Sequence, residues 1–176
     1  MITKRTFLKS SLILGGSVAL GTLVYWKIPA DELLADLDKL PLKFFTADDQ
    51  IVLLAIIPVM LSGTGINKET AIRTIINMDA SIQFLSLTAQ SELRDLFNLL
   101  ANKLGRALLA GIWSTWRTAS PEDIIQFLRG WQNSFMELLQ IGYQGLTQLV
   151  FGNYYSESSS WAHLDYPGPP SLKFQS

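Results

Sequence analysis

The sequence predicts an all-α protein, an irregular bundle of four to six helices that ends in an extended, aromatic and Pro-rich C-terminal tail. Apolar residues recur at helical spacings through most of the chain, and polar cap residues stand where several of these runs begin. Val/Ile runs with a two-residue period, and the Asn-Gly and Asp-Gly pairs typical of hairpins, do not occur in it. We expect an N-terminal signal or anchor (1–30), a linker (31–45), a helical domain (46–151) and the tail (152–176).

The first thirty residues have the layout of an export signal. Lys4, Arg5 and Lys9 precede an uncharged run from Ser10 to Trp26, which combines a basic start with an apolar segment that partitions into a bilayer. The segment 3–9, TKRTFLK, resembles a twin-arginine signal, with lysine in the place of the first arginine. Its four recognition residues would be Lys4, Arg5, Phe7 and Leu8. This resemblance implies the twin-arginine translocase, which carries folded proteins, and a periplasmic location.

An ordinary signal peptide or a single membrane anchor is the alternative for this segment. Seventeen uncharged residues in a helix span about 26 Å, slightly less than the ~30 Å of a bilayer's hydrocarbon core. Glycines and hydroxyl residues keep the run only mildly hydrophobic, which favours a transient signal. Cleavage after Ala30 and lasting membrane association both stay open.

Composition limits the function classes. Four of the 14 Lys and Arg lie in the first thirty residues, so the remaining 146 residues carry 10 basic against 15 acidic side chains. We therefore expect no nucleic-acid partner. The chain has no cysteine, which excludes disulfides and thiolate sites. Its hydrophobic content of 48%, with five Trp and nine Phe, is more than a lone small domain easily hides and suggests a partner surface.

The predicted helices follow from caps and spacing. Thr46 caps a helix from Ala47 toward Pro58, with Asp49 completing a capping box, and the apolar run that follows predicts burial on every side. Pro58 should kink or end this helix. Ser120 with Pro121 marks another start. Three further helices are expected, from 67 to about 85 with Phe84 on the apolar stripe, over 89–110 with Leu104 on it, and over 134–151 with Phe135 and Leu138 on it.

Catalytic patterns are weak in this chain. His163 is the single histidine, and no second histidine or cysteine accompanies it as a metal ligand. Phosphate-binding glycine loops and nucleophile elbows do not occur in the sequence. We therefore expect neither a catalytic residue nor a metal site, and an enzyme with an unrecognised site is the least favoured hypothesis.

Two aromatic stretches call for an explanation. Trp113 and Trp116 stand in the connection after the 89–110 helix, where they either cover the end of the bundle or contact a partner. The tail carries Tyr154, Tyr155, Trp161 and Tyr166 ahead of a PGPP segment. Stiff aromatic side chains on a Pro-fixed backbone make good interface anchors. Folding back over the bundle and contact with a partner both remain open.

The tail resembles the ending of a known family. Its Tyr-Tyr pair, followed by Trp161 and YPGPP at 166–170, is similar to the ending of gluconate 2-dehydrogenase subunit 3-like proteins that carry twin-arginine leaders, with Asp165 where Gly is usual. FLRGWQNS at 127–134 and LAGIWS at 109–114 resemble further segments of that family. The resemblance covers most of the chain.

This resemblance implies a non-catalytic small subunit that binds, matures and exports an FAD-dependent dehydrogenase of the glucose–methanol–choline type. FAD would sit in the large partner subunit and this chain would bind no cofactor; a multihaem cytochrome c subunit often completes such complexes. We expect the interface to use eight residues: Trp113, Trp116, Trp131, Tyr154, Tyr155, Trp161, Tyr166 and Pro167. The alternative is a stand-alone, signal-anchored periplasmic helical scaffold or sensor.

Overall fold

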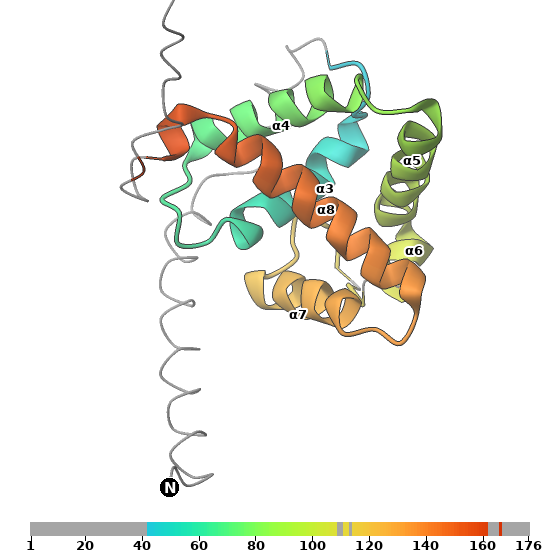
Figure 1. Ribbon diagram of the computed structural model, residues 1–176. Helices are drawn as coiled ribbons and strands as arrows, with labels where there is room; N and C mark the ends of the chain where they lie inside the picture. The colour runs from blue at the N-terminus through green and yellow to red at the C-terminus, as the bar shows by residue number, and fades with distance from the viewer. Residues whose placement is uncertain (1–41, 109–110, 113, 162–165, 167–176) are drawn as a thin grey trace, which may run out of the picture.

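The computed structural model describes residues 42–108, 111–112, 114–161 and 166. Within this part the chain forms α-helices and one short 3-10 helix, with no strand, which confirms the predicted all-α bundle of four to six helices (Figure 1). The elements are α3 (Ala47–Met60), α4 (Lys68–Ile82), α5 (Leu87–Ala101), α6 (Lys103–Leu108), α7 (Pro121–Gln132), α8 (Glu137–Tyr155) and η1 (Ser158–Ser160).

Helix α3 is the centre of the bundle, as its all-round apolar run predicts. It packs against α4, α5, α7 and α8, and its residues from Val52 to Val59 are buried. The capping box of Thr46 and Asp49 starts the helix. Pro58 neither ends nor interrupts it, and the helix runs on to Met60. Because Pro58 lies in the last turn, its missing N–H costs the helix one hydrogen bond near an end.

The other helices surround α3. Helix α8 crosses in front of it and packs against α4 and α7, while α5 lies at the right of the bundle and continues into α6 (Figure 1). Helix α7 begins with the predicted Ser120 cap, a capping box with Asp123 and Pro121 in the first turn. Helix α8 begins at Glu137, and its N-cap residue, Met136, makes no side-chain cap hydrogen bond.

The single helix predicted over 89–110 is two helices. Helix α5 ends at Ala101, where Asn102 takes an extended backbone with ψ of 136°, and α6 then turns against α5. The Asn102 side chain accepts a hydrogen bond from the Leu104 backbone N–H at 2.8 Å. A Cβ at Gly105 would collide with the Leu99 carbonyl oxygen, so only glycine permits this close approach. The apolar spacing continues across the break, and therefore the pattern alone could not reveal it.

Both boundaries of the predicted helical domain need correction. The tail was expected to be extended from 152, but α8 continues through Tyr155 and η1 follows it. The linker was expected to reach residue 45, but Phe45 is buried and its ring contacts Phe97 edge-on, with 5.0 Å between centroids. The signal segment and the first part of the linker, residues 1–41, lie outside the described residues.

Candidate interaction surface

Three of the aromatic residues predicted at a partner interface belong instead to the core of this chain. Trp116, Trp131 and Tyr154 are only 4%, 2% and 4% exposed. The Trp116 indole N–H donates to the Leu100 carbonyl at 2.8 Å, and Phe127 packs edge-on between the two tryptophans. These contacts satisfy both the apolar and the polar parts of the Trp116 side chain. The prediction that they dock a partner is corrected.

The other three described aromatic residues of the predicted interface lie at the end of α8 or pack next to it. Trp161 is half-buried, and its indole N–H donates to the Tyr155 carbonyl at 2.8 Å. Tyr155 is also half-buried and stacks on Phe151. Tyr166 packs edge-on against Trp161 and is 48% exposed, so it is the one member of the predicted set that the described part leaves largely open. The other predicted site residues lie outside the described residues: Lys4, Arg5, Phe7, Leu8, Trp113 and Pro167.

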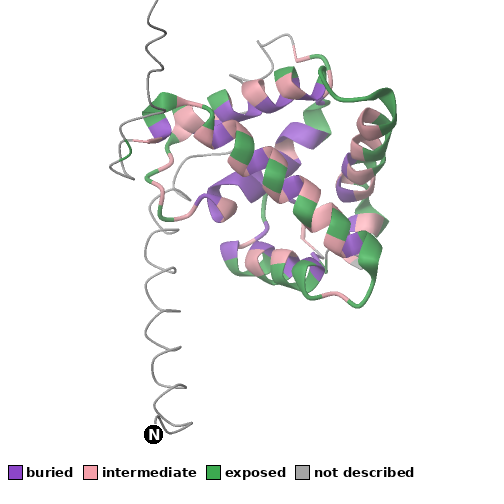
Figure 2. Cartoon of the chain, viewed as in Figure 1, coloured by how far each residue is buried: buried purple, intermediate pink, exposed green. Residues whose placement is uncertain are grey.

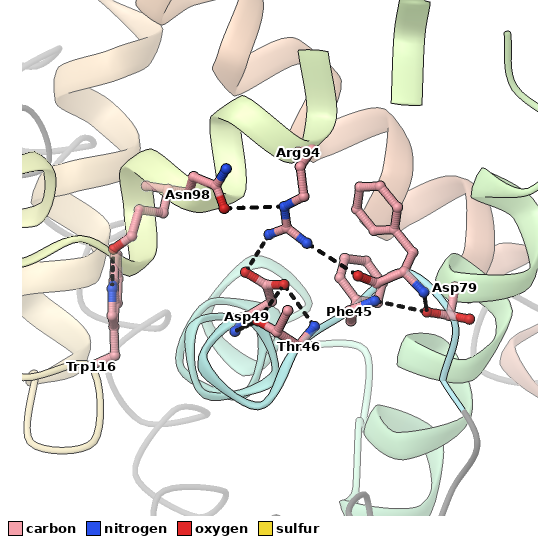
Figure 3. A network of polar contacts seen from close by, with 9 residues as sticks. Phe45, Thr46, Asp49, Asp79, Arg94, Asn98 and Trp116 are labelled. Carbon is pink, nitrogen blue, oxygen red and sulfur yellow. Dashed lines mark hydrogen bonds and ion pairs between the residues drawn. The ribbon is translucent and has the colours of Figure 1, made fainter. Parts of the chain in front are cut away.

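A buried polar network joins the start of the described chain to the bundle (Figure 3). Asp79, on α4, is 5% exposed, and its carboxylate accepts hydrogen bonds from three successive backbone N–H groups. These are the N–H groups of Lys43, Phe44 and Phe45, at 2.9, 2.8 and 3.0 Å. Short bonds to a charged acceptor are among the stronger hydrogen bonds in proteins. Asp79 therefore fixes the path of the chain just before α3.

Arg94, on α5, completes this polar network from the other side. Its guanidinium pairs with the buried carboxylate of Asp49 at 2.7 Å and donates to the Phe44 carbonyl at 3.1 Å (Figure 3). It also lies over the Phe44 ring, 5.0 Å from the centroid. Asp49 accepts from Thr46 as well, through the backbone N–H and the hydroxyl, both at 2.8 Å. Arg94 pairs the charge of Asp49, and backbone N–H groups satisfy the carboxylate of Asp79, so the polar network holds this part of the fold together.

The surface feature that sequence reasoning missed is a set of exposed apolar side chains. Phe84 is 90% exposed, Leu87 83%, Leu104 69%, Phe135 97% and Leu138 70%. Phe84, Leu104, Phe135 and Leu138 were predicted to lie on apolar helix stripes, and the structure corrects this. Phe84 and Phe135 follow the ends of α4 and α7, where the chain has left the helix and the helical spacing no longer fixes a face.

These exposed residues gather on one side of the molecule. The α4–α5 connection, α6 and the α7–α8 connection lie along the same flank, at the right in Figure 1, and Figure 2 shows both connections mainly as exposed. We call this flank the apolar edge. It contains eight of the nine exposed large hydrophobic residues that the structure describes: Phe84, Leu85, Leu87, Leu104, Phe135, Met136, Leu138 and Ile141.

Other kinds of site have little support in the described part of the chain. No group of three or more His, Cys, Asp or Glu stands close enough there to hold a metal ion. Of the helices between Leu42 and Trp161, none combines the length and apolar character that crossing a membrane requires. Compared with known proteins, the chain matches no family model, no curated protein and no solved structure.

Proposed function

We propose that this chain is a non-catalytic small subunit that binds, matures and escorts a folded FAD-dependent sugar or polyol dehydrogenase of the glucose–methanol–choline type through the twin-arginine route. The observation that carries the proposal is the apolar edge. Phe84 and Phe135 are almost fully exposed, and an aromatic side chain buries roughly 150–250 Å² when it is covered. Apolar surface of this extent is costly to leave in water and is typical of a protein–protein interface.

Two further features support this function. The C-terminal YPGPP segment and the TKRTFLK segment resemble those of small subunits with twin-arginine leaders. The buried polar network attaches the chain at residues 43–45 firmly to the bundle. This attachment holds the start of the domain in its folded form, which suits a route that carries folded proteins.

The test is capture of the partner from the native host. The tagged full-length chain should retain a larger chain that lacks an export signal of its own and that gives the eluate the flavin absorbance at about 450 nm. Mass spectrometry should identify that chain as a flavoprotein of the expected class. A colourless eluate that contains only this chain would contradict the proposal and favour the stand-alone scaffold or sensor.

The export part of the proposal has its own test. Arg5→Gln should leave the flavoprotein in the cytoplasm, because the signal that both chains share would no longer be recognised. Lys27→Gln, which removes a basic residue outside the TKRTFLK segment, is the matched control and should leave export unchanged. Flavoprotein reaching the periplasm equally well with Arg5→Gln would refute the shared signal.

A further inference from the structure

We infer that the apolar edge is the surface on which the large flavoprotein docks, and that the flavoprotein meets it with an apolar surface bordered by basic residues. This inference rests on the proposed function and adds the location and chemistry of the contact. The inference places the flavoprotein contact on the α4–α5 connection, on α6 and on the α7–α8 connection. The buried tryptophans, which the sequence predicts at the interface, do not take part in it.

The spacing of the two apolar corners suits a protein partner. One corner is the α4–α5 connection, with Phe84 and Leu87, and the other is the α7–α8 connection, with Phe135 and Leu138. Helix α5, which runs from the first corner toward α6, has 15 residues and is therefore about 22 Å long. Leu104 of α6 stands exposed at its far end. A stable protein interface buries about 800 Å² on each partner, which a flank of this length can supply.

The second corner continues onto the exposed side of α8. Leu138 and Ile141 are three residues apart and so lie on one face of the helix, where they are 70% and 56% exposed. A Cβ added at Gly145, one turn further along, would meet no other atom, so this face is open. Between Glu137 and Glu157 the chain has no charged residue. An uncharged helix face of this kind loses little on desolvation when a partner covers it.

The charges of the edge decide which occupant fits. Glu92 and Asp95 are exposed on α5 and Glu137 is exposed at the start of α8, against two exposed basic residues, Lys103 on α6 and Arg129 in the last turn of α7. A second copy of this chain on the same edge would bring acidic residues against acidic residues, and an anionic membrane would also be repelled. Charge complementarity therefore favours a partner whose apolar docking surface is bordered by Lys or Arg.

Each corner can be tested by a pair of exposed substitutions. Phe84→Ser with Leu87→Ser, and Phe135→Ser with Leu138→Ser, should each lower the amount of captured flavoprotein at least about tenfold, as expected for the loss of apolar anchors. Gln126→Ser is the matched control, because Gln126 is exposed on α7 outside the edge. It should change capture less than about twofold. Circular dichroism should show the same helicity for the three variants and the wild type.

Charge complementarity predicts a second, independent effect. Glu92→Lys with Asp95→Lys should weaken capture, and added salt should then strengthen the remaining binding by screening the new repulsion. Glu122→Lys, on the first turn of α7 and outside the edge, is the control and should leave capture and its salt dependence unchanged. Equal capture by the two charge variants would overturn the assignment of a basic partner surface.

Failure of the inference and failure of the proposed function give different results. If the wild type captures flavoprotein and the corner variants capture it equally well, the proposed function stands and the edge is not the docking surface. If the wild type captures none, both are overturned. The purified chain should be a monomer, and any flotation with phosphatidylglycerol vesicles through the segment 1–30 should be the same for the corner variants and the wild type. A dimer or vesicle binding that the corner variants abolish would assign the edge to another occupant and overturn the inference.

Discussion

Two groups of large aromatic side chains in this molecule have opposite surroundings. Trp116, Phe127 and Trp131 pack edge-on in the core between α7 and the α5–α6 region, whereas Phe84 and Phe135 stand in water at the corners of the apolar edge. The buried group includes residues whose chemistry is typical of interfaces, and the exposed group consists of ordinary apolar residues at helix ends. Trp131 lies one residue before the end of α7 and Phe135 lies three residues after it, so residue type alone does not separate the two groups.

The sharpest test of this comparison is the stability of one variant from each group. Trp131→Ala should lower the free energy of unfolding by about 3–5 kcal/mol, because it leaves a large cavity in the core. Phe135→Ala, four residues later, should change it by less than about 0.5 kcal/mol. Urea unfolding followed by circular dichroism measures both. Similar losses for the two variants would contradict the assignment of Trp131 to the core.

The buried polar network should be nearly as sensitive as the core. Arg94→Met removes the partner of the Asp49 carboxylate, which is 1% exposed, and should cost about 3 kcal/mol. Adding Asp49→Asn should recover part of that loss, since no unpaired charge is then buried. A double-mutant cycle by urea unfolding measures the coupling energy. Losses that simply add would show that the two side chains do not interact.

The break between α5 and α6 should have an intermediate effect. Gly105→Ala places a Cβ against the Leu99 carbonyl oxygen and forces α6 away from α5, at a cost of about 2 kcal/mol. Gly130→Ala is the matched control, because a Cβ at Gly130 meets no other atom and the change suits the helix interior of α7. It should stabilise the protein by about 0.5–1 kcal/mol. Equal effects in thermal unfolding would argue against the tight turn at Asn102.

A substitution in the apolar edge should have the smallest effect on the free energy of unfolding. Phe84→Ser should leave the free energy of unfolding within about 0.5 kcal/mol of the wild type, because the ring is 90% exposed. It should nevertheless reduce the binding of a fluorescent apolar dye to the protein. Tyr166→Ser, outside the edge, is the control and should reduce dye binding less. Clear destabilisation by Phe84→Ser would show that this ring contributes to the core.

Features that depend on neighbouring residues could be predicted from the sequence, and features that depend on distant ones could not. The capping boxes at Thr46 and Ser120 involve residues three positions apart, and both are present. The bonds from Asp79 to residues 43–45 span more than thirty residues, and the Arg94–Asp49 pair spans 45. Nothing in the sequence around Asp79 or Arg94 indicates these distant partners.

The same limit explains the errors at the candidate site. Apolar spacing places Phe84 at the end of one helix and Phe135 at the start of another, but the first helix stops at Ile82 and the second begins only at Glu137. Helix ends are the least certain part of any pattern, so residues beyond them lose their assigned face. The aromatic character of Trp131 and Tyr154 suggests an interface, but the same rings serve a core equally well, and both are buried.

The buried polar network also determines how the molecule would respond to mechanical tension. A pull on the chain ahead of Leu42, such as the proposed passage through the translocase would exert, reaches the three N–H bonds to Asp79 and the Arg94 contacts first. These contacts belong to α4 and α5, which would share the force before it could unwind α3 from its first turn. The domain would thus resist unfolding from its N-terminal end. A protein that crosses a membrane in its folded form needs this resistance.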